Sequence, residues 1–272
     1  NPAAGLYEWV ETGPLMAAVE IASDGQDTSD TQLEPWPDWE RRDPADLLKR
    51  IADAGLVGMG GAAFPTHVKL SPPPAKKIDT LILNGVECEP CLTADHRLML
   101  EAPERILAGA RIMARILGVS HVRIGIEMNK PDAIARMAAC GGASALAVEA
   151  LHVRYPQGAE KQLIFALTGR RVPTGGLPMD VGCVVQNVGT AAAVADAVIE
   201  GRPLIERVTT VTGTPVVRPG NWRVRVGTPY ARLFEWAGGV KADPAKIVSG
   251  GPMMGLSVCS LDVPVMKSTS GI

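Results

Sequence analysis

The chain has 272 residues, which is long enough for two domains of ordinary size with buried cores. Hydrophobic residues make up 46% of the sequence, charged residues 21%, and the formal net charge is −2. Without a basic block, this globular composition argues against nucleic acid as a partner. No apolar run approaches the roughly 18 residues of a membrane-spanning helix, and the five scattered cysteines favour a reducing compartment over a disulfide framework.

The first elements follow from capping and periodicity. Residues 1–42 are expected to be an arm, because the stretch from 23 to 43 is polar, acidic and interrupted by prolines. Asp43 as N-cap and Pro44 at the first helical position predict a helix that Gly55 ends. From about residue 78 to 200 the patterns alternate, with strands predicted at 78–85, 121–127 and 150–155 and helices at 102–118, 130–142, 159–169 and 187–201. This alternation predicts a parallel α/β sheet covered on both faces.

The composition of the sequence changes after Gly201. Residues 207–227 are rich in valine, threonine and turn residues and predict a hairpin. A short helix is predicted at 228–239, and a further strand begins within 245–252. This order of elements is typical of a compact β-grasp-like unit.

Residues 58–63, "GMGGAA", satisfy the dinucleotide-binding pattern GxGxxA, but a helix precedes them where that pattern requires a strand. Two interpretations remain: a phosphate-binding loop or a tight packing turn. Phe64 adds a face for ring stacking and Lys69 a charge suited to phosphate. A loop without side chains also allows a flat ring system to approach the backbone.

A second constellation, "NGVECEPC", follows the strand predicted at 78–85. Asn84 offers a hydrogen-bond donor and an acceptor, and Glu87 and Glu89 alternate, so in an extended chain they share one face. Such acceptors suit ribose hydroxyls or a nicotinamide amide. Cys88 and Cys91 form a CxxC pair, interpreted either as a redox or metal pair or, more simply, as two small buried residues in a turn.

A third constellation lies between residues 155 and 190. Gly158 begins a predicted helix with Glu160 in its first turn, and residues 170–180 form a glycine-rich polar loop. The run "QNVGT" either caps the next helix or holds a ligand, through Gln186, Asn187 and Thr190. The four histidines are given no catalytic role.

Five segments in this order resemble the RnfC subunit of the Rnf electron transport complex: "GLVGMGGAAFPTHVKL", "NGVECEPCLTADHRLM", "YPQGAEKQL", "VVQNVGT" and "KIVSGGPMMG". That subunit is similar to the FMN- and NADH-binding subunit of respiratory complex I. The resemblance implies a Rossmann-like parallel-sheet FMN/NADH domain at 43–202 and a β-grasp (SLBB-type) domain at 203–265. Residues 1–42 are then an arm with the remnant of a barrel-like domain, and residues 266–272 a truncated link to an absent iron–sulfur domain.

The resemblance also implies roles for particular residues toward FMN and NADH. It places Lys69 toward the flavin, Phe64 on the adenine of NADH, and Asn84 on the flavin or its ribityl chain. Gly58, Gly60 and Gly61 would line the FMN, and Glu87 and Glu89 would border the nucleotide. Gly158 and Glu160 would come near NADH. Gln186, Asn187 and Thr190 would hold the phosphate end of FMN.

Four positions depart from the family pattern. Ala63 stands where glycine is frequent, Val86 and Ala159 stand where complex I has acids, and Val172 stands where a second adenine-stacking aromatic is expected. FMN is therefore better supported than NADH.

The implied function is to pass electrons between NADH and ferredoxin through FMN and [4Fe–4S] clusters, coupled to ion movement by the membrane complex. The clusters are expected only in the absent C-terminal part. The implied partners are the other subunits of a bacterial inner-membrane complex and a ferredoxin-type carrier, and the implied location is peripheral, on the cytoplasmic face of that membrane. Two alternatives remain: an RnfC-like cobalamin reductase, and a non-catalytic docking module with an empty flavin site.

Overall fold

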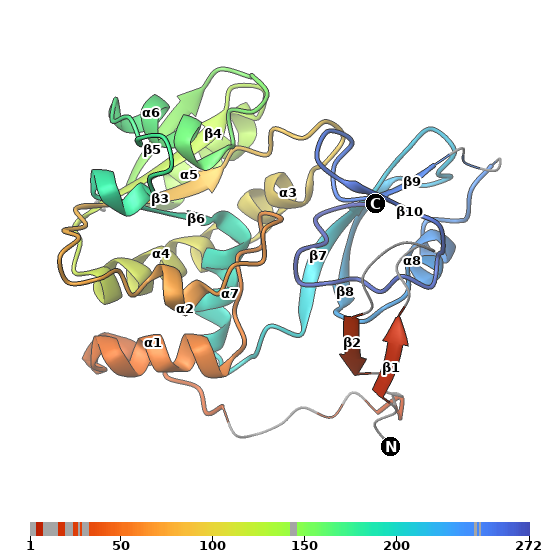
Figure 1. Cartoon of the computed structure of the whole chain (residues 1–272), viewed down its shortest axis with the longest axis horizontal. Helices are drawn as coiled ribbons and strands as arrows, with labels where there is room; N and C mark the ends of the chain where they lie inside the picture. The colour runs from red at the N-terminus through yellow and green to blue at the C-terminus, as the bar shows by residue number, and fades with distance from the viewer. Residues whose placement is uncertain are drawn as a thin grey trace. The chain divides into compact units, whose positions relative to one another are not determined.

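The computed structural model describes residues 4–7, 16–19, 24–26, 28, 33–141, 146–241, 244 and 246–272. The chain divides into two units, Asn1–Gln32 and Leu33–Ile272. In the first unit, strands β1 (Ala4–Tyr7) and β2 (Met16–Val19) pair antiparallel (Figure 1). Of the arm expected at 1–42, residues 1–3, 8–15, 20–23, 27 and 29–32 lie outside the described residues.

A four-stranded parallel sheet organises the second unit. Its spatial order is β5 (Leu146–Leu151), β4 (His121–Glu127), β3 (Thr80–Gly85) and β6 (Cys183–Asn187). The chain runs outward from β3 to β5 and then returns to the other side of β3. The strand order therefore reverses between β3 and β6, and ligands of open α/β sheets bind at such a switch point, beyond the carboxyl ends of the strands.

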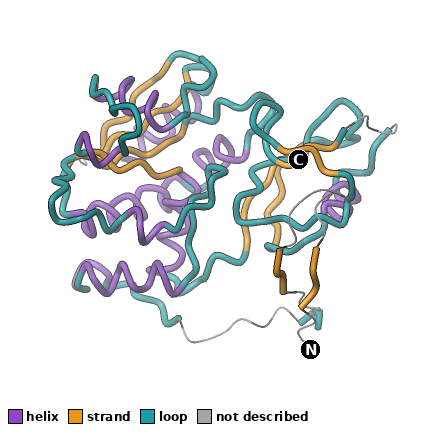
Figure 2. Tube along the Cα trace, in the orientation of Figure 1, coloured by secondary structure: helices purple, strands orange, loops and turns teal. Residues whose placement is uncertain are grey.

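Helices cover both faces of this sheet (Figure 2), which confirms the α/β prediction. Apolar side chains of α4 (Pro103–Leu117), α5 (Pro131–Gly141) and α7 (Val188–Ile199) share one core with alternate residues of β3 and β4, such as Leu81 and Leu83. The opposite side chains of β3, including Ile82, pack with α6 (Glu160–Thr168). A short 3-10 helix, η2 (Pro178–Val181), contributes Val181 to this second core.

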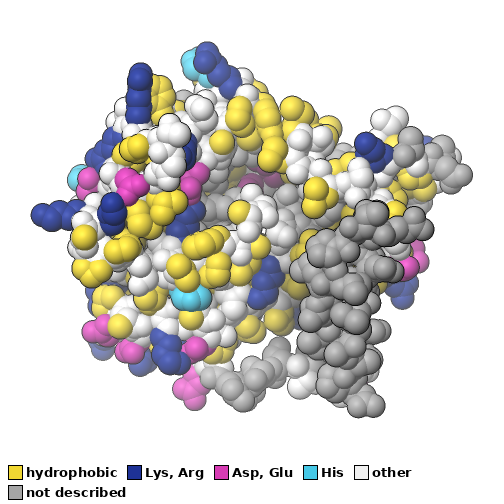
Figure 3. Space-filling view, viewed as in Figure 1, with side chains coloured by type: hydrophobic (Ala, Val, Ile, Leu, Met, Phe, Trp, Pro, Cys, Tyr) yellow, Lys and Arg dark blue, Asp and Glu magenta, His cyan; other side chains and the backbone are white. Residues whose placement is uncertain are grey.

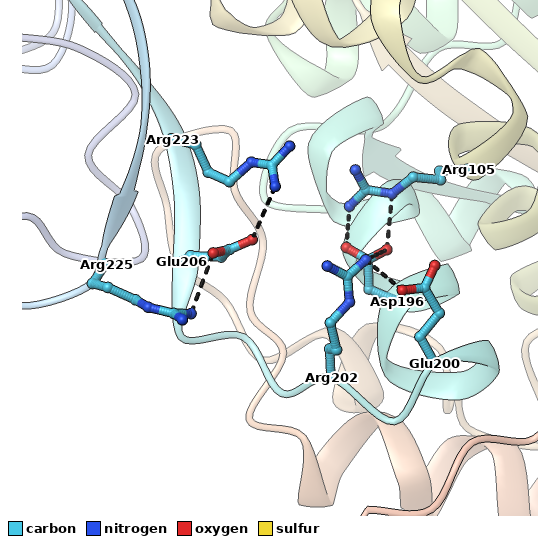
Figure 4. A network of polar contacts seen from close by, with 7 residues as sticks. All are labelled: Arg105, Asp196, Glu200, Arg202, Glu206, Arg223 and Arg225. Atoms are coloured by element: carbon cyan, nitrogen blue, oxygen red, sulfur yellow. Dashed lines mark hydrogen bonds and ion pairs between the residues drawn. The ribbon is translucent and has the colours of Figure 1, made fainter. Parts of the chain in front are cut away.

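Helices α4 and α7 come into backbone contact at Gly109, where no side chain fits between them. A Cβ on Gly109 of α4 would overlap the carbonyl of Ala191 in α7. A charged network reinforces the contact (Figure 4): Arg105 binds Asp196 through two guanidinium nitrogens, and Arg202 lies 3.0 Å from the same carboxylate. The network holds the end of α7 where the chain leaves for the next strand.

Three local predictions need correction. The strand expected at 150–155 is β5, which runs from Leu146 to Leu151. Helix α3 (Ala94–Glu101) was not predicted, because its hydrophobic pattern is weak and its N-terminus is held by a distant carboxylate described below. Residues 33–42, expected within the arm, belong to the second unit: the N–H of Trp36 donates to Val198, and the ring of Trp36 lies under the guanidinium of Arg50 in α1 (Pro44–Asp53). Indole packing and a cation–π contact override the polar composition of this stretch.

The C-terminal part forms the predicted β-grasp unit. Strands β7 (Glu206–Val211) and β8 (Gly220–Arg225) form a hairpin, α8 (Tyr230–Trp236) packs beside it, and β9 (Ile247–Ser249) pairs with β10 (Leu256–Val258). The segment at 266–272, expected as a link, lies alongside β7: Ile272 donates its N–H to Thr210 and packs in the core with Tyr230.

Among the residues that the structure describes, none of the helices is long and apolar enough to cross a membrane. On the face drawn in Figure 3, lysine and arginine side chains are interspersed with acidic and hydrophobic ones.

Candidate functional site

The glycine loop connects α1 to the short helix α2 (Thr66–Lys69). Gly55 ends α1 with φ +66°, a conformation that favours glycine. A bridge between Val57 and Pro65, and a 2.8 Å hydrogen bond from the N–H of Gly58 to the carbonyl of Phe64, then close the loop at its base. The predicted glycine cluster is thus a projecting loop after a helix, as its sequence context indicated.

Met59 anchors the loop from below. It is 8% exposed, and its N–H donates to the hydroxyl of Thr190 in α7 at 2.9 Å. The next residues, Gly60 and Gly61, are exposed, and in the described part of the chain their N–H groups have no hydrogen-bond partner. A Cβ on Gly61 would meet no atom within 4 Å. The tip of the loop is therefore bare main chain with free donors, which is the feature that anion- and ring-binding loops share.

The carboxyl ends of β3 and β6 meet beside this loop. Asn84 and Asn187 are partners in the register of the two strands. The amide of Asn84 donates to the carbonyl of Gly158 at 2.9 Å and accepts from the N–H of Val86 at 3.0 Å. A Cβ on Gly158 would lie 2.6 Å from the carbonyl oxygen of Val86, so only glycine permits this approach. The second and third constellations of the sequence are thereby brought together at the switch point.

Glu87 and Glu89 point in different directions, so the expectation that they share one face is wrong. The chain leaves the extended conformation after Gly85. The carboxylate of Glu87 accepts from the N–H groups of Asp95 and His96 at the start of α3, at 3.0 and 3.2 Å. Glu89 accepts instead from two N–H groups of the β-grasp unit, as described below. Glu87 is the distant carboxylate that holds α3.

The structure confirms the capping interpretation of the "QNVGT" segment, and the ligand-holding interpretation stays a prediction. Asn187 is the N-cap of α7: its oxygen accepts from the N–H groups of Gly189 and Thr190, and its nitrogen donates to Asp95 at 2.7 Å. Thr190 is completely buried and holds Met59. Gln186 is 2% exposed, and its Nε2 has no partner among the described atoms, which leaves a buried donor at the end of β6.

A polar cluster lies beneath these loops, in which Glu127, Lys130 and Arg207 are buried and Glu87 and Asp95 are half-buried. Lys130 pairs with Glu127 at 2.6 Å. Burial and the neighbouring Asp95 raise the pKa of Glu87 to about 8, and burial also raises the pKa of Asp95. Burial lowers the pKa of Arg207 to about 10, against the attraction of Asp95.

Sequence reasoning missed four members of this cluster, all but Glu87. They lie far apart along the chain, and only the Asp95 in "TADHR", within a segment quoted for the resemblance, offered a signal.

Two predicted ligands at the rim contact each other. Lys69 of α2 pairs with Glu160 at the start of α6, with 2.5 Å between Nζ and Oε1. Phe64 is 51% exposed, so its ring is available for stacking. Tyr155, which sequence reasoning did not select, is also exposed, and its pKa is raised, first by desolvation and then by the nearby Glu89 and Cys88.

The cysteines of the CxxC motif are free thiols. Cys88 is half-buried, and burial raises its pKa. Cys91 is exposed, so the interpretation of both as buried residues is wrong for Cys91. Within the described residues, no group of three or more His, Cys, Asp or Glu side chains is arranged to hold a metal ion.

These features fit a flavin nucleotide. The free N–H groups of Gly60 and Gly61 suit phosphate or a ring edge, and the unpartnered amide of Gln186 lies at the carboxyl end of β6. Of two cavities, one of about 440 Å³ lies at the opposite, amino ends of the strands, around His121 and Arg170, and one of about 290 Å³ lies between α1, α2 and α4. Neither includes the exposed tip of the glycine loop.

Comparison with known proteins agrees with this fit. The family model described as "Nuo51 FMN-binding domain" matches residues 51–196, and the "SLBB domain" model matches residues 208–257. A solved NAD⁺-reducing [NiFe]-hydrogenase, in its H2-reduced state, is similar in structure: the TM-score is 0.69 at 26% identity, over 84% of this chain and 46% of the hydrogenase chain.

Two bacterial relatives are similar over nearly the whole chain. One, a subunit of the proton-translocating ferredoxin:NAD(+) oxidoreductase complex of Clostridium ljungdahlii, is 51% identical over 94% of this chain and 56% of its own length. The other, the corresponding subunit of the Na(+)-translocating complex of Acetobacterium woodii, is 49% identical over 96% and 59%. The chain thus spans little more than half the length of these relatives. It belongs to the Nuo51 FMN-binding domain family, with an SLBB domain following, and the predicted resemblance to the RnfC subunit is confirmed.

Proposed function

We propose that this chain is the FMN- and NADH-binding part of an oxidoreductase subunit that passes electrons between NADH and ferredoxin. The observation that most directly supports this proposal is the bare loop tip at Gly60 and Gly61, whose free N–H groups lie beside the sheet's switch point. Membership of an FMN-binding family and relatives named as ferredoxin:NAD(+) oxidoreductase subunits support the same function.

Each residue contributes binding or orientation. Bound FMN supplies hydride acceptance and one-electron release. The N–H groups of Gly60 and Gly61 would hold its anionic or ring oxygens, and Lys69, which pairs with Glu160, would add a cation. Phe64 offers its face to the adenine of NADH. Glu89 offers acceptors to ribose hydroxyls. The assignments of Gly58, Asn84, Glu87, Gly158, Gln186, Asn187 and Thr190 belong to the same proposal, the last two through the loop they support.

The wider setting is part of the proposal. The relatives' names describe complexes that move protons or sodium ions, so we infer that this chain works within a membrane-associated complex, peripherally on the cytoplasmic face of a bacterial inner membrane. Electrons leave through [4Fe–4S] clusters in a part of the subunit outside this sequence. The boundary between the α/β domain and the β-grasp domain near residue 203 is proposed with it.

The test is a titration of the purified chain with FMN, followed by anaerobic addition of NADH. We expect submicromolar FMN binding and bleaching of the flavin absorption by NADH. Gly60→Val should abolish binding, because a Cβ at Gly60 already lies 3.5 Å from Asn187 and further carbons would fill the loop's open side. Gly118→Asn, at the distant left-handed end of α4, is the control and should bind as wild type does.

The outcome also separates the alternatives. A chain that takes up no FMN is the docking module. A chain whose bound flavin NADH reduces, and which then reduces cob(III)alamin in place of ferredoxin-type acceptors, is the cobalamin reductase.

A further inference from the structure

Two cations of the β-grasp unit reach the base of the glycine loop. Arg207 of β7 is 5% exposed. Its guanidinium donates to the carbonyl of Lys267 at 2.5 Å and approaches the carbonyl of Met59 at 3.5 Å. Lys267, in the segment beside β7, donates through Nζ to the carbonyl of Gly55 at 2.6 Å. We call Arg207 and Lys267 the two-cation clamp.

The clamp fixes the two points from which the loop tip projects. Gly55 is the residue that ends α1, and a Cβ there would lie 2.8 Å from the ammonium of Lys267, so the cation packs directly on the main chain. Met59 has its N–H held by Thr190 and its carbonyl faced by Arg207. Met59 is thus contacted at both of its backbone polar groups, and it directly precedes Gly60 and Gly61, whose N–H groups have no partner among the described residues.

The β-grasp unit also contacts the loop that follows β3 and carries Glu89. Glu89 accepts from the N–H groups of Met253 and Met254, each at 2.9 Å. A Cβ on Gly251 would overlap that carboxylate, so the "GGPMMG" turn is shaped to receive it. This gives a role to a motif that the proposed function leaves without one.

Stability alone is a weak explanation for the clamp. Removing a guanidinium and an ammonium from water is costly. Packed apolar side chains would join the β-grasp unit to the α/β domain as well or better. Here both cations point at carbonyls of the loop that carries the free donors.

We propose that the β-grasp unit is a working part of the cofactor site, in which Arg207 and Lys267 are positioning residues that hold the glycine loop in its ligand-binding conformation. The identity of the ligand rests on the proposed function, whereas the clamp's hold on the loop does not. Neither cation touches the ligand; they act through the carbonyls of Met59 and Gly55.

The experiment compares four variants of the whole chain with wild type. Lys267→Met removes one cation, Lys267→Arg retains it, and Arg207→Lys keeps the charge but loses the planar fork. Arg223→Met is the matched control, because Arg223 lies on β8 of the same hairpin, is largely exposed and lies 4.0 Å from Glu206 (Figure 4). The first measurement is FMN affinity by quenching of flavin fluorescence, and the second is amide hydrogen exchange of residues 55–64 without FMN.

We expect Lys267→Met and Arg207→Lys to weaken FMN binding by about 10- to 100-fold, as loss of outer-shell support does at metal sites. Lys267→Arg should restore most of the affinity, and Arg223→Met should match wild type. Exchange should accelerate at residues 55–64 in the two weakened variants and remain unchanged elsewhere.

Several results would overturn the proposal: unchanged FMN affinity, unchanged exchange at 55–64, or exchange accelerated uniformly over the chain, which would indicate lost stability instead of lost positioning. If wild type binds no FMN, the proposed function fails, and hydrogen exchange alone then decides the clamp. If Lys267→Met fails to fold, Arg207→Lys and Lys267→Arg carry the same comparison.

Discussion

The polar cluster beneath the loops contains three carboxyl groups, those of Glu87, Asp95 and Glu127, and two cations, Lys130 and Arg207. Glu127 is matched by Lys130 at 2.6 Å. Desolvation and the mutual repulsion of Glu87 and Asp95 favour a proton on one of the two. Burial first, and repulsion by Asp95 second, explain the raised pKa of Glu87.

The raised pKa of Glu87 predicts that the stability of the fold depends on pH. The pKa of Glu87 is about 8 in the folded chain against an ordinary 4.5, so the folded state holds a proton that the unfolded state releases. The free energy of unfolding should therefore fall as pH rises from about 4.5 to 8, by at most about 1.4 kcal/mol per pH unit from this group. Glu87→Gln, uncharged throughout, should flatten that decline in urea unfolding measured at successive pH values.

The control is Glu40→Gln at an exposed position, which should keep the wild-type slope. Equal slopes for wild type and Glu87→Gln would show that Glu87 is already ionised in the folded chain.

Ala63 is a departure from the family pattern with a backbone consequence. Its φ is +51°, in the left-handed region that disfavours alanine. We expect Ala63→Gly to raise the free energy of unfolding by up to about 1 kcal/mol, because relief of the left-handed strain exceeds glycine's entropic cost. Ala62→Gly, at a neighbour without positive φ, should lower it, and thermal unfolding of both variants measures the difference. If Ala63→Gly lowered the free energy of unfolding as much as Ala62→Gly does, Ala63 would not be strained in the wild-type chain.

At the scale of elements, the contact of α4 with α7 depends on a missing side chain. Gly109 lies directly against the backbone of Ala191, and backbone cannot move aside as a flexible side chain can. Gly109→Ala, although alanine favours helices, should therefore destabilise the chain by about 3 kcal/mol or more.

Chemical denaturation measures this effect. Ala108→Ser, one residue earlier and only half-buried, is the control and should change stability by about 0.5 kcal/mol or less. A Gly109→Ala variant as stable as this control would mean that the helices separate without cost.

The elements themselves were largely predictable. The helix at 44, the alternation from β3 to α7 and the hairpin after Gly201 follow from apolar periodicity and from caps such as Asp43, whose carboxylate accepts from the N–H of Ala45. Helix α3 was missed because Glu87, eight residues before Asp95, holds its start. A cap supplied by a distant loop leaves no local signal.

At the scale of the whole second unit, the β-grasp domain and the α/β domain share polar contacts at several points. Besides the clamp and Glu89, Thr93 at the start of α3 exchanges hydrogen bonds with Asn221, and its N–H donates to Thr210. These contacts join the β-grasp hairpin to the start of α3, whose first N–H groups Glu87 holds. The two domains that the sequence separates are therefore in direct contact beside the candidate site.

The sequence by itself determined the α/β sheet, the β-grasp unit, the projecting glycine loop and the family, because periodicity, caps and ordered motifs are local properties of the chain. Only the tertiary structure decided that Glu87 and Glu89 diverge, that Thr190 and Arg207 hold Met59 from two sides, and that Asp95 lies in the polar cluster beneath the loops. Contacts between residues over a hundred positions apart depend on how the strands are ordered and how the two domains pack, and no local pattern records either.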